Sequence, residues 1–145
     1  MQRLAPLLLI PLLACNGDAD TLVDTEDTDD TEELAKFALT FDGTGYDTND
    51  GQTIYVQVVQ DGTLLLTGED NAVVTMGAFS FSFDEAITET HGYSVYYYID
   101  VNADSACVAT DDTTGFVWFG DVAAAHAIDL SPGINEPADT SCVVF

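Results

Sequence analysis

The sequence contains very little positive charge. Among its 145 residues, Lys and Arg together number two, against 26 Asp and Glu, so the formal net charge is −24 at pH 7. Nucleic acids and anionic membrane patches both require clustered Lys or Arg side chains, so neither is an expected partner. The hydrophobic fraction of 47% is nevertheless too high for a disordered chain, and part of the sequence must therefore bury a core.

Residues and motifs that many enzymes use are also scarce. There are two histidines, no G-x-S-x-G motif and no Gly-rich phosphate loop, which argues against a Ser-His-Asp hydrolase and against phosphate binding. Acidic residues are so frequent that pairs of carboxylates arise by chance, and they do not by themselves indicate a glycosidase. Both methionines, Met1 and Met76, precede the histidines, so the ligand order of small exported copper proteins is absent. We expect a non-catalytic protein.

The amino terminus has the pattern of an export signal. One Arg within residues 1–3 precedes ten apolar residues that include two prolines. Such a run rises about 15 Å as a helix, roughly half the hydrocarbon thickness of a bilayer, so it is too short for a permanent transmembrane span. The pattern predicts a signal peptide.

The end of this signal, Leu12-Leu13-Ala14-Cys15, resembles the lipobox of bacterial lipoproteins. In that family the cysteine is diacylated and becomes the first residue after cleavage. The resemblance implies that residues 1–14 are removed, that Cys15 carries acyl chains such as palmitate, and that these anchor the protein at the bacterial outer membrane or cell surface. The alternatives are an ordinary secretory signal with an incidental cysteine, and an uncleaved buried helix.

Residues 15–33 begin with this cysteine and continue as an acidic segment. Nine of the 18 residues from Asn16 to Glu33 are acids, and only Leu22 and Val23 are large apolar residues. The segment cannot bury enough surface to offset its ordering entropy, and its like charges repel one another. We expect an extended, disordered linker. The alternative is a calcium-buffering strip.

Residues 34–145 alternate between apolar and polar side chains with a period of two, which predicts a β domain. Asp61-Gly62 predicts a two-residue hairpin turn. Seven or eight short strands fit an antiparallel β-sandwich of immunoglobulin-like or transthyretin-like type, with a small barrel as the alternative. For the alanine-rich segment 122–128, a helical turn is the alternative to a strand. The expected strands are 37–41, 54–60, 63–67, 79–83, 93–101, 115–121, 123–130 and 140–145.

The segment His91–Asn102 carries a second resemblance. Its sequence, HGYSVYYYIDVN, is similar to the G-x-Y-x-V strand and D-x-N loop of transthyretin-like and prealbumin-like sandwich domains of bacterial surface proteins. The resemblance implies that Tyr93 and Val95 face the core and that the acidic loop caps the sheet.

With Cys15 acylated, Cys107 and Cys142 remain as an even pair in an exported protein. They are expected to form a disulfide. It would close a loop of about 36 residues and stabilise the fold by roughly 3 to 4 kcal/mol in the chain-entropy treatment. A redox or metal role would require a motif such as C-x-x-C, which is absent.

One loop has the spacing of a calcium site. Asp100, Asn102, Asp104 and Asp111 stand at positions 1, 3, 5 and 12, with the Ala106 carbonyl at position 7. The run resembles the D-x-[DN]-x-D loops of EF-hands and of calcium sites in exported β domains, and Ca²⁺ is the one cofactor that we expect. The alternative is an Asx-rich loop whose side chains bind its own backbone.

Tyr96 and Tyr98 share a strand face with Asp100, opposite the residues expected in the core. If exposed, they predict a carbohydrate-binding or adhesive surface, because sugar rings stack on aromatic rings; otherwise they pack on a neighbouring strand. Trp118, between two apolar residues, is expected in the core. The sequence therefore predicts a lipid-anchored envelope module with a carbohydrate or an envelope protein as partner, and a small exported enzyme is the remaining alternative.

Overall fold

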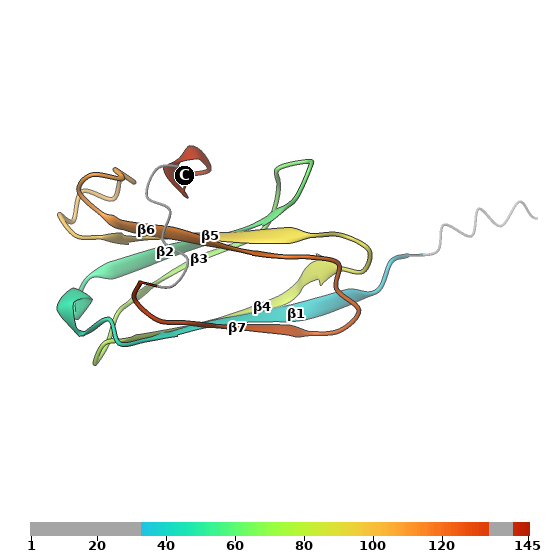
Figure 1. Ribbon diagram of the computed structural model, residues 1–145, viewed down its shortest axis with the longest axis horizontal. Helices are drawn as coiled ribbons and strands as arrows, with labels where there is room; N and C mark the ends of the chain where they lie inside the picture. The colour runs from blue at the N-terminus through green and yellow to red at the C-terminus, as the bar shows by residue number, and fades with distance from the viewer. Residues whose placement is uncertain (1–32, 134–140) are drawn as a thin grey trace, which may run out of the picture. The chain divides into compact units, whose positions relative to one another are not determined.

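The computed structural model of the chain describes residues 33–133 and 141–145. The predicted signal peptide, Cys15 and the linker up to residue 32 lie outside the described residues and stay predictions. The described part is all-β, with two stacked sheets and no α-helix (Figure 1). This confirms the predicted β-sandwich.

Seven strands and two short 3₁₀ turns make up the fold. One sheet has the strand order β4-β1-β7 and the other β3-β2-β5-β6. All neighbouring strands are antiparallel except β1 and β7, which pair in parallel and lie near opposite ends of the described chain. The elements are β1 (Lys36–Thr44), η1 (Asp47–Asn49), β2 (Thr53–Gln60), β3 (Leu65–Val73), β4 (Ala78–Thr88), β5 (Tyr93–Asp100), β6 (Thr113–Phe119), β7 (His126–Leu130) and η2 (Ser141–Val143).

The core lies between the two sheets and follows the predicted period of two. On β5, Tyr93 and Val95 are fully buried, as the resemblance of this segment implies. The rings of Phe41 on β1 and Tyr97 on β5 have centroids 5.7 Å apart, so they join the two sheets directly. Each fully buried side chain of this size contributes about 1.5 to 3 kcal/mol relative to an exposed one. The core is therefore sufficient to hold two short-stranded sheets together.

Two glycines make room for the largest core rings. Phe79 lies over Gly43, and the hydroxyl end of Tyr97 lies over Gly115, so closely that a Cβ on either glycine would overlap the ring or its hydroxyl. Neither glycine has a positive φ. They are needed for space within the core and not for a turn.

The connection between β2 and β3 is longer than predicted. It comprises four residues, Asp61–Leu64, so the prediction of a two-residue turn at Asp61-Gly62 is wrong. Gly62 does have the positive φ that such a turn requires, 77°, but Leu64 has one too, 53°. The pairing register of the two strands also shifts: Val58 pairs with Gly68 but Val59 pairs with Leu66, so β3 has one extra residue, Thr67, at this point.

The alanine-rich segment before β7 is neither strand nor helical turn. Residues 122–125 are irregular, and the strand predicted over 123–130 is observed only from His126 onward. β7 pairs with β1, whereas β6 belongs to the other sheet. The chain therefore uses this segment to cross from one sheet to the other, which a continuous strand could not do.

The carboxyl-terminal segment is not the predicted eighth strand. Within the described residues 141–145 it forms the turn η2, because Cys142 is bonded to Cys107 in the loop after β5. The Cα atoms of the two cysteines are 5.3 Å apart, and the predicted disulfide is confirmed. The bridge holds the segment against β5 and β6, on the side of the sheet that faces away from the core (Figure 1). It therefore does not extend the sheet at an edge.

Candidate functional site

Aromatic side chains gather on the outer side of the β3-β2-β5-β6 sheet. Successive side chains of a strand point to opposite faces, so residues that pair with Tyr96 or Tyr98 in register share their face. Tyr98 stands opposite Tyr55 and Thr114, and Tyr96 stands opposite Phe116. We call this surface the aromatic face, made up of Tyr55, Tyr96, Tyr98, Phe116, Trp118 and, from the carboxyl-terminal segment, Phe145.

Trp118 lies on the aromatic face and not in the core, where the sequence places it. Its side chain is 62% exposed. The prediction failed because β6 carries large apolar residues on both of its faces, so the neighbours of Trp118 give no indication of its direction. Since Phe119 is buried on the inner side, the strand alternation turns Trp118 outward.

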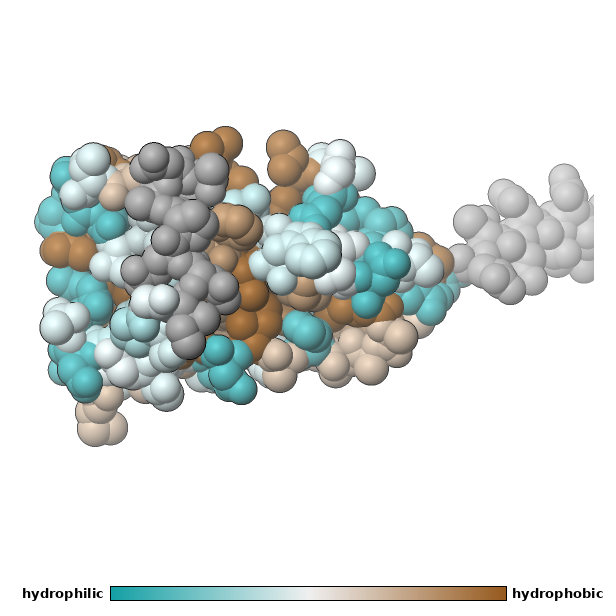
Figure 2. All heavy atoms as spheres, in the orientation of Figure 1, coloured by the Kyte–Doolittle hydropathy of each residue, from teal (hydrophilic) through white to brown (hydrophobic). Residues whose placement is uncertain are grey.

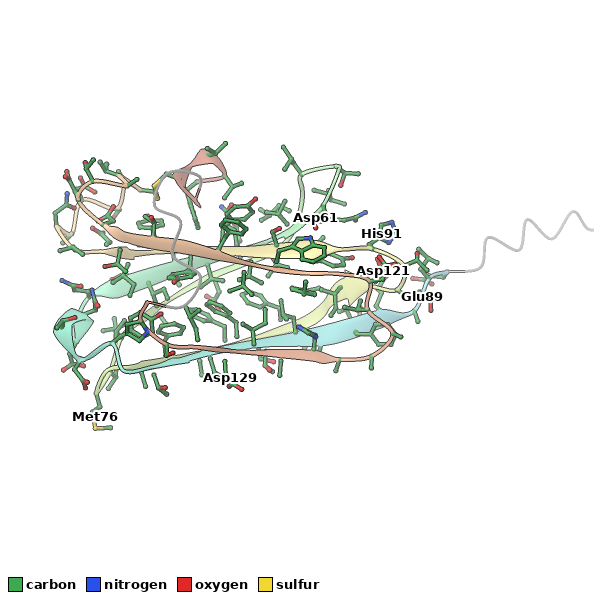
Figure 3. The ribbon with its side chains drawn as sticks, viewed as in Figure 1. Asp61, Met76, Glu89, His91, Asp121 and Asp129 are labelled. Carbon is green, nitrogen blue, oxygen red and sulfur yellow. A yellow bond between two sulfur atoms is a disulfide. The ribbon has the colours of Figure 1, made fainter. Side chains whose placement is uncertain are left out.

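Asp61, at the base of the β2–β3 hairpin, holds the indole in place (Figure 3). The Trp118 Nε1 donates a hydrogen bond to Asp61 Oδ2, and the Ser94 hydroxyl donates to Asp61 Oδ1 at 2.9 Å. The backbone N–H of Asp61 is itself tied to the carbonyl of Gly92 at 2.9 Å. An exposed tryptophan is thereby fixed in orientation, with a carboxylate at the edge of its ring.

The two tyrosines predicted to bind a ligand are on one face but in different surroundings. Tyr98 is only 3% exposed. Its ring stacks on Tyr55, with centroids 4.7 Å apart, and the ring of Phe145 meets it edge-on at 4.8 Å. Tyr96 is half-buried and stacks on Phe116 at 5.7 Å. Tyr98 therefore supports the surface from below, while Tyr96 keeps part of its ring accessible.

Burial also changes the chemistry of Tyr98. The pKa of the phenol is raised to about 12, mainly by burial and, to a smaller extent, by the nearby Tyr55 and Asp100. The hydroxyl is therefore neutral at any physiological pH.

A hollow of about 350 Å³ opens beside the covered tyrosine. Tyr55 and Phe145 supply aromatic surface to its lining, and Gln57, Glu69 and Asn71 supply polar groups. A concave site with a few polar groups among aromatic rings suits a ligand that has both apolar and hydroxyl-rich surfaces.

The predicted calcium loop lies at the opposite end of β5 from the hairpin. The structure brings Asp100, Asn102 and Asp104 together there. The buried Asp100 carboxylate accepts hydrogen bonds from the backbone N–H groups of Asp104 at 3.2 Å and Ser105 at 2.9 Å. Asn102 Oδ1 also accepts from the N–H of Asp104 at 3.1 Å, and Asn102 Nδ2 donates to Asp104 Oδ2 at 3.0 Å. These oxygens thus bind the loop's own polar groups, as in Asx turns.

Asp111, the predicted fourth ligand, does not join this group. It is exposed, and its Oδ1 accepts a hydrogen bond from the Thr110 hydroxyl at 3.0 Å. Asp112 turns into the loop instead and accepts from the N–H groups of Val101 at 3.0 Å and Val108 at 2.9 Å. Sequence reasoning missed Asp112, because the calcium-loop spacing indicates Asp111 and the two aspartates lie in a turn where strand alternation does not apply.

The loop fits calcium only in part. Over residues 33–133 and 141–145, no three His, Cys, Asp or Glu side chains lie close enough together to hold a metal ion. The carboxylates of Asp100 and Asp104 and the amide of Asn102 converge. Asp111, which is needed to complete the coordination shell of a calcium ion, does not join them. The loop is complete with its own hydrogen bonds, and calcium binding stays a prediction.

Comparison with known proteins identifies no relative. No protein-family model matches the chain, and no curated protein matches it. Among the described residues, no helix is long and apolar enough to cross a membrane.

Proposed function

We propose that this protein is a lipid-anchored, non-catalytic binding module of the bacterial envelope, and that the aromatic face is its binding surface. The observation that carries the binding role is the exposed Trp118, which is held in one orientation by Asp61 on a face that is otherwise aromatic. Tryptophan is the side chain most typical of binding hot spots, and an oriented ring loses little entropy when a ligand covers it. The lipobox resemblance supports the anchor, and the disulfide suits an oxidising compartment outside the cytosol.

The anchor is tested by Cys15→Ser. The wild-type protein should fractionate with membranes, and the serine variant should be released into the soluble fraction, because its signal lacks the sulfur that is acylated. As a control, Asp18→Asn, three residues after Cys15, should leave the fractionation of the protein with membranes unchanged. Membrane retention of a serine variant from which residues 1–14 have been removed, as checked by mass spectrometry, would overturn the anchor.

Carbohydrate is the ligand class that the aromatic face favours. The flat, exposed ring of Trp118 suits the C–H face of a sugar, and unpaired lone pairs of Asp61 can accept sugar hydroxyl hydrogens at the ring edge. Tyr96 and Phe116 extend the aromatic surface along β5 and β6. In this proposal Tyr98 contributes by supporting the surface and does not touch the sugar.

A glycan array followed by calorimetry tests this ligand class. Binding to one or more glycans is expected, and Trp118→Ala should weaken it at least tenfold. Ser82→Ala, an exposed position on the other sheet, is the matched control and should bind normally. A blank array, or equal binding by both variants, would favour an envelope protein as the partner.

Calcium is proposed as a stabilising ion of the loop 100–112, supported by the convergence of Asp100, Asn102 and Asp104. The melting temperature is measured in CaCl₂ and in NaCl of equal ionic strength. An increase that is specific to calcium and absent in Asp104→Ala supports the site, whereas an equal response to both salts shows only screening of the acidic surface.

A further inference from the structure

The β2–β3 hairpin exposes three consecutive leucines. Leu64, Leu65 and Leu66 are 71%, 57% and 43% exposed. Leu64 also has a φ of 53°, in the left-handed region that non-glycine residues seldom adopt. Within the described residues, packing of these side chains contributes little to stability. Contiguous exposed apolar surface of this kind usually marks a contact site. Their role therefore lies in a contact outside the domain.

The apolar surface around the hairpin is continuous with the aromatic face. A groove is lined by Leu64, Leu66, Val59 and Val143, the last of which belongs to the carboxyl-terminal segment. Figure 2 shows hydrophobic projections along the upper edge of the molecule, where Figure 1 places the hairpin and this segment. The hairpin is the part of this surface nearest to the end of the sandwich.

The chain enters the domain at the same end. The N–H of Asp61 in the hairpin donates to the carbonyl of Gly92 in the β4–β5 connection at 2.9 Å. The N–H of Glu89, in that same connection, donates to the carbonyl of Ala35 just before β1 at 3.0 Å. Figure 1 shows the hairpin and the start of β1 at one end of the two sheets. Leu34, which is exposed, lies at this end as well.

The tip of the hairpin carries no charge, a feature that it shares with the β3–β4 turn around Met76 at the opposite end of the sandwich. Residues 62–68 contain no ionisable side chain, in a sequence with 26 acidic residues. At the opposite end of the sandwich, the exposed side chains of Asp47, Asp50, Asp104 and Asp111 surround the loops. Beyond Asp61, the tip of the hairpin is thus uncharged and apolar, whereas Glu89 and Asp121 lie at the same end of the sandwich (Figure 3).

We infer that the Leu64–Leu66 hairpin inserts its side chains into the interfacial layer of a lipid bilayer. The inference rests on the proposed anchor, because the 18 residues between Cys15 and Leu34 span at most about 65 Å and so keep the hairpin near the membrane that holds the acyl chains. Tethering raises the local concentration of bilayer around the hairpin, so three leucines are sufficient even though their individual contacts are weak. The acids behind the hairpin are repelled by anionic lipids, and zwitterionic lipid is therefore the preferred surface.

The single tryptophan of the chain allows a direct test. In a Trp118→Phe background, Leu65→Trp places the only indole on the hairpin, and Met76→Trp places it on the β3–β4 turn at the opposite end. Met76 is the control, because like Leu65 it is an apolar and mostly exposed side chain, at 86% against 57%. In Figure 3, Met76 lies at one end of the sandwich and Glu89 at the other, with Asp61 in the half that contains Glu89.

Both lipidated variants are reconstituted into phosphatidylcholine vesicles that contain brominated acyl chains. The Leu65→Trp indole should be quenched several-fold more strongly than the Met76→Trp indole and should emit at shorter wavelength. Replacing half of the lipid with phosphatidylglycerol should reduce the difference. Equal quenching at the two positions in proteins that float with the vesicles would overturn the inference.

Flotation reports the anchor separately. If neither lipidated variant floats, the anchor fails, and the hairpin is then tested in the soluble Cys15→Ser protein at high vesicle concentration. Sedimentation with phosphatidylcholine vesicles should fall several-fold when all three leucines are replaced by serine, and should not change in Met76→Ser. The inference is overturned if these variants sediment with the vesicles equally. It is also overturned if the protein is a dimer in analytical ultracentrifugation and the same leucine replacements dissociate that dimer.

Discussion

The outer faces of the two sheets differ sharply, although their inner faces are alike. Both inner faces are packed with aromatic and aliphatic side chains. The outer face of β4-β1-β7 is made of small and acidic residues, which water satisfies, whereas the outer face of β3-β2-β5-β6 carries several aromatic rings among polar side chains such as Gln57, Glu69 and Asn71. The residues on the first are Thr40, Asp42, Ser80, Ser82, Asp84 and Asp129. Folding alone explains the polar face but not the exposed Trp118, and this difference is the reason why the proposed binding role belongs to the β3-β2-β5-β6 sheet.

Among the described residues, the aromatic face also has a cover that the polar face lacks. The carboxyl-terminal segment reaches it through the disulfide and places Phe145 against Tyr98. The covered part of the face serves stability and the bare part around Trp118 is available to a ligand. The experiments below separate these two parts.

Releasing the carboxyl-terminal segment from the aromatic face should lower the stability of the protein more than any other change. The double change Cys107→Ser and Cys142→Ser should lower the free energy of unfolding by about 3 to 4 kcal/mol, because the disulfide closes a loop with a sequence separation of 35. Urea unfolding measures this. Cys15→Ser, outside the domain, is the control and should have no effect. A loss below about 1 kcal/mol would mean that the bridge does not constrain the unfolded chain.

Alkaline pH should weaken the covered part through Tyr98. Burial raises the pKa of its phenol to about 12 in the folded protein, above its ordinary value of 10.0, so the fold favours the neutral form. The stability that the neutral phenol contributes is fully present below pH 10 and is lost as the pH rises through about 12. The total loss in the free energy of unfolding is at most about 3 kcal/mol. Urea unfolding between pH 9 and 12 should therefore show a steeper decline in wild type than in Tyr98→Phe. The control is Phe116→Leu, which changes the same face without altering an ionisable group, and it should decline as wild type does.

The acidic loop should depend on Asp100 and not on Asp111, even with calcium removed. Asp100→Ala leaves the N–H of Ser105 without its acceptor and should cost about 2 kcal/mol in a chelating buffer. Asp111→Ala should change stability by less than about 0.5 kcal/mol, because this side chain is exposed. Equal losses in thermal unfolding would contradict the hydrogen-bonded description of the loop.

The smallest effects on stability should come from the bare part of the two faces. Trp118→Ala should cost about 1 kcal/mol, since it loses the hydrogen bond to Asp61 but little buried area. Ser82→Ala on the polar face should stay within about 0.5 kcal/mol. If Trp118→Ala lost several kcal/mol in urea unfolding, the indole would be a folding element and the difference between the faces would lose its functional meaning.

Patterns among residues that are close in the sequence predicted those features of the structure that neighbouring residues determine. The inward positions of Phe37–Phe41 and Tyr93–Ile99 follow from strand alternation. The Cys107–Cys142 bridge followed from the number of cysteines left after the anchor. The D-x-N-x-D spacing correctly located a tight loop, but the hydrogen bonds that close it include Asp112, which the spacing did not indicate.

Residues with apolar neighbours on both sides could not be assigned to a face in this way. β6 presents Phe116 and Trp118 on one side and Val117 and Phe119 on the other, and hydrophobicity does not distinguish them. The cover over Tyr98 depends on Phe145, which is 47 residues away in the chain. Only the folded protein brings such residues together.

The sequence by itself determined the strand class of the domain, its acidic surface and the pairing of its two remaining cysteines, because these depend on composition and on the alternating direction of successive Cβ atoms. The tertiary structure decided that β1 pairs with β7 in parallel, that Trp118 faces outward, and that one outer face is aromatic while the other is polar. These outcomes depend on which strands lie side by side, and that is a collective result of burying both inner faces at once.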